Sequence, residues 1–95
     1  MQWKLFATLA ETAGSEVTVP ADEAMSLREA LEALLAAEPA LEEQILAESG
    51  ELRDHIRLLH GGEDPFAAGD GWETTVGPDD ELAVFPPVSG GYRRS

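Results

Sequence analysis

The chain has 95 residues and no cysteine, which predicts one compact domain and excludes disulfides, a thiolate nucleophile and cysteine metal sites. Nineteen acidic and six basic side chains give a net charge of −13, which disfavours binding to nucleic acid or to an anionic membrane. The apolar runs are too short for a membrane span or a signal peptide, so we expect a cytoplasmic protein.

The charge also indicates a high-salt setting. Only one of the six basic residues, Lys4, is lysine, and excess acid with arginine favoured over lysine is typical of halophilic proteins. Self-repulsion is tolerable in such a setting because the Debye length falls to about 3 Å near 1 M salt. Disorder is the alternative interpretation of an acidic chain, but the periodic apolar segments described next argue against it.

The first predicted strand covers residues 2–7. Alternation places its side chains in two sets: Trp3 and Leu5 on one face, Lys4 and Phe6 on the other. After a turn at residues 13–15, residues 16–19 alternate again and predict a second strand. The chain is therefore expected to begin with a hairpin.

A helix is predicted to begin at Ser26. Ser26 and Glu29 have the spacing of a capping box, in which each side chain satisfies a backbone amide of the other. One face of the helix is a continuous apolar stripe of Leu27, Leu31, Leu34 and Leu35. Pro39 ends this helix and a shorter one is predicted over residues 40–46.

The C-terminal half predicts three further strands, over residues 54–60, 73–76 and 81–85. In the first of these Ile56 and Leu58 are expected to point inward. Residues 63–72 are predicted to be a loop in which the side chains of Phe66 and Trp72 fold back against the domain and bury themselves there as plugs. The order of elements predicts an α+β fold: a mixed sheet of about four to five strands with a helix packed across one face. The first and last strands are expected to pair in parallel at its centre.

The segment after the last strand is the most informative part of the chain. Pro86 and Pro87 end the strand, because proline has no backbone N–H to donate. Gly90 and Gly91 follow a few residues later. They lack Cβ atoms, so this part of the chain can pass through a narrow slot toward a partner's catalytic groups. The competing interpretation is that Gly-Gly is a frayed end or a linker.

Residues 80–91 are similar to the C-terminal signature of the MoaD/ThiS group of β-grasp proteins. Within that group the chain most resembles the ubiquitin-like small archaeal modifier proteins of haloarchaea. Residues 3–7 and 54–63 fit the family in type and position, and the resemblance covers residues 1–91. It implies a ubiquitin-like β-grasp domain over residues 1–91, with residues 86–91 as a flexible tail.

The resemblance also implies a chemical role for the Gly91 carboxylate. In this family an activating enzyme of the ubiquitin/MoeB type uses MgATP to convert that carboxylate into an acyl-adenylate. Sulfur transfer then gives a thiocarboxylate, the sulfur donor for molybdopterin synthesis or tRNA thiolation; in the modifier branch, the terminus is joined to lysines of target proteins. Ser89 and Gly90 would thread the tail into the enzyme. The chain itself would need no cofactor and would be no enzyme.

The chain departs from the family pattern after Gly91, because four more residues follow, Tyr92 to Ser95. Gly91 then has no free carboxylate. One interpretation is a precursor that a protease, such as a metalloprotease, cleaves between Gly91 and Tyr92. The other is that residues 92–95 are a remnant of how the chain was produced.

Several side chains are candidates for partner binding. If Leu82 and Val84 point inward, an outward patch forms beside the tail and would dock the activating enzyme or the large subunit of molybdopterin synthase. The candidate residues are Phe6, Leu59, Phe85, Pro86, Pro87 and Val88. The alternative is that the loop 63–72 covers them. Lys4 is either an acceptor for a second modifier or simply an exposed charge.

Other chemistry is not supported by the sequence. His55 and His60 lie five residues apart on a predicted strand, on opposite faces, so we predict no metal site. The carboxylates are scattered and give no reason to predict a hydrolase. Three interpretations remain open: a modifier and sulfur carrier, a small subunit of molybdopterin synthase acting only as sulfur donor, or a β-grasp binding domain whose Gly-Gly is inert.

Overall fold

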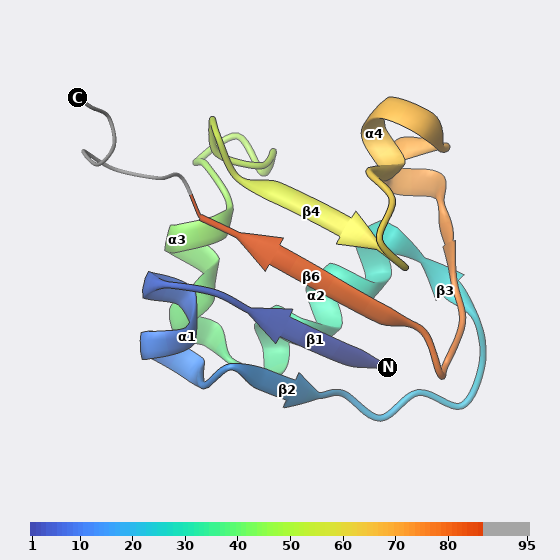
Figure 1. The fold of residues 1–95 in the computed structure, drawn as a ribbon, viewed down its shortest axis with the longest axis horizontal. Coiled ribbons are helices and arrows are strands. Elements are labelled where there is room, and N and C mark those ends of the chain that lie inside the picture. The colour runs from blue at the N-terminus through green and yellow to red at the C-terminus, as the bar shows by residue number, and fades with distance from the viewer. Residues whose placement is uncertain (87–95) are drawn as a thin grey trace.

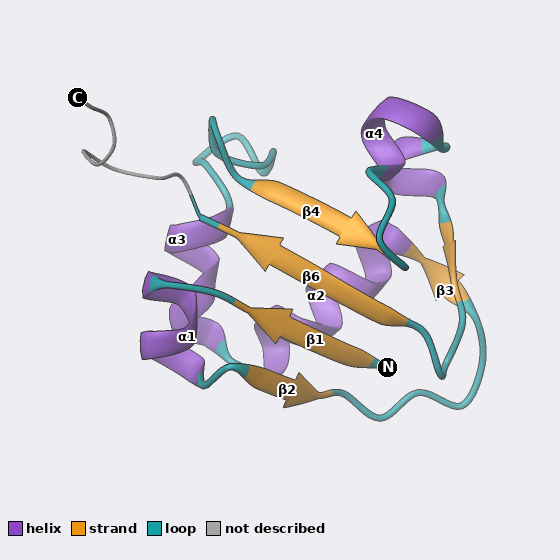
Figure 2. Ribbon diagram, viewed as in Figure 1, coloured by secondary structure: helices purple, strands orange, loops and turns teal. Residues whose placement is uncertain are grey.

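The computed structural model describes residues 1–86, and its centre is a mixed four-stranded sheet. The strands are β1 (Gln2–Leu5), β2 (Glu16–Thr18), β4 (Arg57–His60) and β6 (Glu81–Phe85), in the order β2-β1-β6-β4. The central pair β1 and β6 is parallel, and β2 and β4 flank it antiparallel (Figures 1 and 2). The predicted parallel pairing of the first and last strands is confirmed.

Helix α2 (Leu27–Ala37) packs behind this sheet, as Figure 1 shows. The capping box is present: the Glu29 amide donates to Ser26 Oγ at 3.2 Å, and Glu29 Oε1 accepts from the Ser26 amide at 3.0 Å. The predicted leucine stripe is confirmed, since all four leucines are buried against the sheet. Two core residues from the strands, Trp3 and Val84, are also fully buried.

Short helices close one end of the core. The 3₁₀ helix η1 (Pro39–Leu41) and α3 (Glu42–Ile45) follow α2 and agree with the helix predicted over residues 40–46. Helix α1 (Thr8–Ala13) connects β1 to β2 and was not predicted. It has no side-chain cap, and its only buried residue is Leu9, so it lacks the apolar stripe that marks a helix in sequence.

The segment between β4 and β6 differs most from the prediction. Residues 63–72 are not an open loop, because they contain α4 (Pro65–Ala68) and the start of η2 (Gly71–Glu73). Phe66 is not a plug: it is 43% exposed and meets Trp72 edge-on at 5.1 Å, whereas Trp72 packs on the core. Strand β5 (Thr75–Val76) is shorter than predicted and pairs with β3 (Met25–Ser26), a strand that was not predicted.

Strand β4 begins at Arg57, three residues later than predicted. The chain turns at His55, whose φ of 71° lies in the left-handed region and is incompatible with a strand. Histidine is one of the few residue types other than glycine that adopt this conformation more often than average. Ile56 and Leu58 are buried as predicted. Within residues 1–86 no helix has the length and apolar character to cross a membrane.

We expect the fold to be stabilised by salt. Up to residue 91 the chain has nineteen acidic and four basic side chains, a net charge of −15, and few of these carboxylates have a cationic partner in the described part. Screening this repulsion should raise Tm by about 5–15 °C between 50 mM and 2 M KCl. For a domain of this size, that shift corresponds to an increase of about 1–2 kcal/mol in the free energy of unfolding. Thermal unfolding followed by circular dichroism measures this.

A charge-reduced variant is the matched control for this prediction. Glu11, Glu23 and Glu48 are exposed, and their side chains make no ion pair within residues 1–86, so changing all three to glutamine should raise Tm at 50 mM KCl and flatten its salt dependence. Equal salt dependence in the variant and the parent would attribute the effect to general salting-out and contradict the repulsion argument.

Candidate functional site

Strand β6 positions the start of the C-terminal tail. It lies between β1 and β4, and its last residue, Phe85, is still in register with Arg57. Pairing on both sides makes this one of the most constrained strands of the sheet, and Pro86 follows immediately. Strand β6 and Pro86 therefore end at a fixed point at one end of the sheet (Figure 1).

The start of β6 is also anchored, by Asp80. Its carboxylate accepts from the Gly77 amide at 2.8 Å and lies 2.7 Å from His60 Nε2. The hydrogen bond from Gly77 and then that from His60 hold the pKa of Asp80 below its usual value of 3.8. These bonds tie the turn before β6 to the end of β4.

Because the pKa of Asp80 is lowered by folding, the ionised carboxylate stabilises the folded state above its unfolded-state pKa, and this stability is lost as the pH falls through the folded pKa. We expect Asp80→Asn to reduce the free energy of unfolding by about 1 kcal/mol at pH 7, a modest value because the group is partly exposed. The difference from the parent should shrink below pH 4. Urea unfolding from pH 7 to pH 2, with Asp79→Asn as the neighbouring control, measures it; a constant difference would contradict the assignment.

The sheet face opposite α2 carries an aromatic pair. Phe6 and Phe85 stack with ring centroids 4.3 Å apart and an interplanar angle of 10°. They meet because Leu5, the last residue of β1, pairs with Val84 in the parallel register, so the residues that follow these two lie beside each other on the outward side. Strand alternation and register place Leu59 and Ala83 on the same face, next to this pair.

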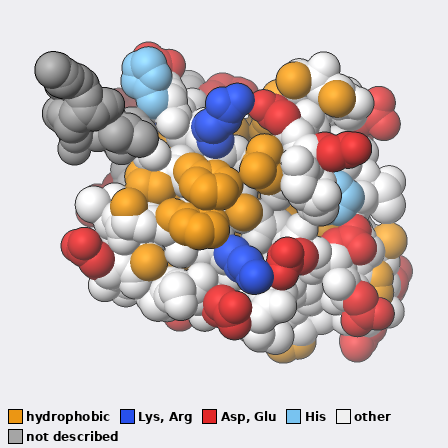
Figure 3. Space-filling view, in the orientation of Figure 1, with side chains coloured by type: hydrophobic (Ala, Val, Ile, Leu, Met, Phe, Trp, Pro, Cys, Tyr) orange, Lys and Arg blue, Asp and Glu red, His pale blue; other side chains and the backbone are white. Residues whose placement is uncertain are grey.

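We call Phe6, Leu59, Ala83 and Phe85 the outer face. It is open, because Phe6 is 40% exposed and Phe85 and Leu59 are half-buried. Figure 3 shows an apolar patch on this side of the molecule, with basic side chains on two of its flanks. The segment over residues 63–72 lies against β4 and α2 and leaves Phe6 exposed.

Lys4 and Arg57 also belong to this side of the sheet. Lys4 pairs across the strands with Ala83 and makes an ion pair with Glu81 at 3.2 Å. Arg57 pairs with Phe85 at the edge strand β4 and is exposed. The sequence analysis did not select Arg57 or Ala83. Alternation could have found both, because Arg57 lies two residues from Leu59 on β4 and Ala83 lies two residues from Phe85 on β6.

The predicted tail residues lie outside the described residues: Pro87, Val88, Ser89, Gly90, Gly91 and Tyr92. Pro86 is described and half-buried. The two histidines do not share a site, because His55 is exposed in the turn before β4 and His60 bonds Asp80. Within residues 1–86 no three His, Asp or Glu side chains lie close enough to hold a metal ion.

Comparison with known proteins agrees with this architecture. The model of the ThiS family matches residues 3–91. Small archaeal modifier protein 1 of Haloferax volcanii is 53% identical over 92 residues, which cover 96% of this chain and 100% of the relative. The crystal structure of that Haloferax protein superposes with a TM-score of 0.83 at 46% identity, covering 96% of this chain and 98% of the other.

A more distant relative gives the same result. The solution structure of small archaeal modifier protein 1 from Methanosarcina acetivorans has a TM-score of 0.76 at 31% identity, and the match covers 95% of this chain and 94% of that one. The β-grasp fold predicted from the sequence is thereby confirmed. The chain belongs to the ThiS family of β-grasp proteins, among its small archaeal modifier proteins.

Proposed function

We propose that this chain is a ubiquitin-like protein modifier and sulfur carrier that acts through the carboxylate of Gly91. The observation that carries the proposal is the open outer face at the end of the central strand that leads into the Gly-Gly tail. The similarity of the chain to a small archaeal modifier protein supports the same conclusion. The chain acts as the substrate of a partner enzyme, and its own residues supply binding and delivery.

The chemistry requires activation, because a carboxylate is a poor electrophile. A Gly91 carboxylate oxygen attacks the α-phosphorus of MgATP held by the activating enzyme, and pyrophosphate leaves. AMP is then the leaving group when a sulfur nucleophile forms the thiocarboxylate. In conjugation, the neutral amine of a target lysine attacks the carbonyl carbon of the adenylate, the bond to AMP breaks, and the amine loses a proton as the isopeptide bond forms. Cleavage between Gly91 and Tyr92 must come first, since the amide bond leaves no carboxylate at Gly91.

The outer face would hold the activating enzyme while the tail reaches its active site. Exposed aromatic side chains that become buried at the centre of an interface contribute most of its binding energy. Phe6 and Phe85 are already stacked, so little conformational freedom is lost when a partner covers them. Lys4 lies on the same side of the sheet, so we assign it an ordinary surface role in its ion pair with Glu81 rather than that of an acceptor.

The fate of the tail in cells tests the proposal. The chain would be expressed in a haloarchaeal host, its adducts captured with an antibody, and the digest searched for branched peptides in which Gly91 is joined to a lysine. Such peptides from several proteins are the expected result. A thiocarboxylate with one stoichiometric large-subunit complex and no branched peptides would instead make the chain a dedicated synthase subunit. Neither product would make it a non-conjugated binding domain.

A further inference from the structure

Arg57 differs from the other basic residues of the described chain. Within residues 1–86, three of the four basic side chains have an acceptor inside the molecule. The acceptors are Glu81 for Lys4, Glu51 for Arg28 and the carbonyl oxygen of Glu43 for Arg53, at 3.2, 3.7 and 2.6 Å. Arg57 has no ion pair or side-chain hydrogen bond in that part of the chain.

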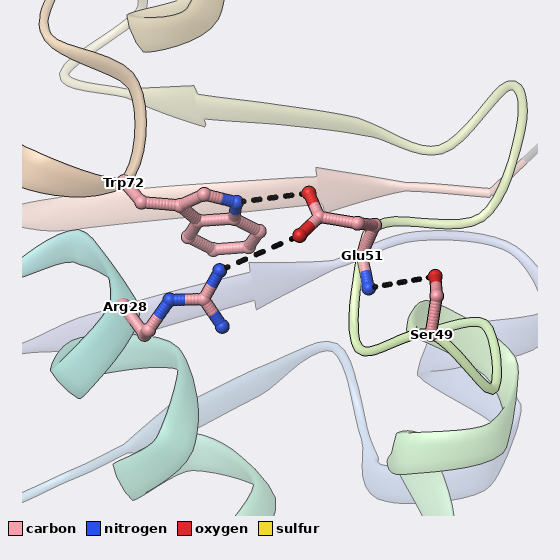
Figure 4. A network of polar contacts seen from close by, with 4 residues as sticks. All are labelled: Arg28, Ser49, Glu51 and Trp72. Carbon is pink, nitrogen blue, oxygen red and sulfur yellow. Dashed lines mark hydrogen bonds and ion pairs between the residues drawn. The ribbon is translucent and has the colours of Figure 1, made fainter.

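Arg28 is a contrasting case, because its exposed side chain makes several contacts within the molecule. Its guanidinium lies 4.4 Å from the ring centroid of Trp72 and pairs with Glu51, which also accepts from Trp72 Nε1 at 3.3 Å (Figure 4). Arg28 thus joins α2 to the loop before β4 and to η2, and its role is structural. Arg57, exposed on β4, makes no such bond between elements of the described chain.

An arginine without an ion pair among residues 1–86 is notable, because all nineteen acidic side chains lie in that part of the chain. Its position accounts for this: Arg57 lies opposite Phe85, its neighbours Leu59 and Ala83 carry no charge, and Glu81, farther along the same side of β6, pairs with Lys4. The guanidinium therefore lies at the rim of the apolar outer face, where residues 1–86 supply no acceptor for it.

We propose that Arg57 pairs with a carboxylate on the protein that docks on the outer face, and so determines which partner is accepted. This inference rests on the proposed function, in which that partner is the enzyme that activates Gly91. An arginine fork binds a carboxylate through two parallel hydrogen bonds, which fixes orientation as well as adding affinity. The matching surface of the enzyme would be an apolar centre with an acidic residue at its edge.

The charge of the chain favours this partner over a second copy of itself. Two molecules with a net charge of −13 each repel one another, and of the two basic side chains beside the outer face, Lys4 is already paired with Glu81. An enzyme that presents one carboxylate next to an apolar surface satisfies both features of the face. At high salt long-range steering is screened, so the arginine would act by direct contact.

The test is the affinity of the full chain for its cognate activating enzyme, measured by calorimetry at 0.2 M and 2 M KCl. We expect Arg57→Ala to weaken binding about 10-fold and Arg57→Glu about 100-fold, with Arg57→Lys between the parent and the alanine variant. Arg53→Ala is the matched control, because it changes the net charge as Arg57→Ala does, at an exposed residue bonded to α3 and not part of the outer face, and it should bind as the parent does. Unfolding midpoints of all variants establish that they are folded.

The outcomes separate this inference from the proposed function. Binding unchanged by Arg57→Ala and Arg57→Glu, but lost when Phe6 and Phe85 are changed to alanine, would overturn the role of Arg57 and leave the docking face in place. Binding unaffected by any of these changes would overturn the docking face as well. Concentration-dependent dimers that Arg57→Glu abolishes would assign Arg57 to self-association and also overturn the inference.

Discussion

A chain that ends at Gly91 is expected to form an acyl-adenylate with its activating enzyme and MgATP at least about 100-fold faster than the chain that ends at Ser95, a difference of about 3 kcal/mol in the activation barrier. The reason is chemical. Only a free carboxylate has an oxygen that can attack the α-phosphorus of ATP, whereas the amide at Gly91 of the longer chain has none. ATP–pyrophosphate exchange with purified components measures the rate.

Two controls make this result specific to Gly91. A chain that ends at Gly90 has a free carboxylate one residue short, so it should lose most of the activity by failing to reach the nucleotide. The chain that ends at Ser95 must be shown by mass to be intact after the assay. Exchange at equal rates by the 91-residue chain and the intact 95-residue chain would exclude Gly91 as the activated residue.

Replacing both Phe6 and Phe85 by alanine is expected to lower kcat/KM for activation by about 10- to 100-fold. The loss should appear mainly in KM, because the aromatic pair binds the enzyme and takes no part in the chemistry. The free energy of unfolding should fall by only about 1 kcal/mol, since the stacked rings are partly exposed and contribute little beyond their mutual contact.

Phe66 offers a matched control for this variant. It is as exposed as Phe6, at 43% against 40%, but it lies on α4 away from the outer face. Phe66→Ala should leave activation unchanged. If Phe66→Ala and the double variant reduced kcat/KM equally, loss of general surface hydrophobicity would account for both, and the outer face would have no specific role.

The sequence was sufficient to predict the elements that build the main sheet and its helix. Alternation correctly placed Trp3 and Leu5 on the buried face of the sheet and Phe6 on the other. The end of β6 was predicted because Pro86 stops the strand. The capping box at Ser26 located the start of α2 to the residue. Such signals are local, and each arises from the same physical cause in the sequence and in the fold.

The elements that were missed depend on contacts distant in sequence. Helices α1 and α4 have six and four residues, too short to show an apolar period, so they are formed by the packing of their surroundings. β3 is a strand of two residues that exists only because β5 lies beside it. The late start of β4 follows from the left-handed conformation of His55, a residue that carries no obligatory turn signal.

The alternation of side chains along each strand predicted which residues of the candidate site share a face, but not how they contact one another. Phe6 and Phe85 were placed on one face, but their stacking follows from the register of β1 against β6, which the sequence does not state. The role of Asp80 and the isolation of Arg57 depend on pairing between β4 and β6 in the same way.

The most direct test of the central claim is the intact mass of this chain recovered from haloarchaeal cells. The account predicts a product that ends at Gly91, with a fraction in which one terminal oxygen is replaced by sulfur or in which the terminus is joined to another protein. A chain that still ends at Ser95, unmodified throughout, would contradict the claim that it acts through the Gly91 carboxylate.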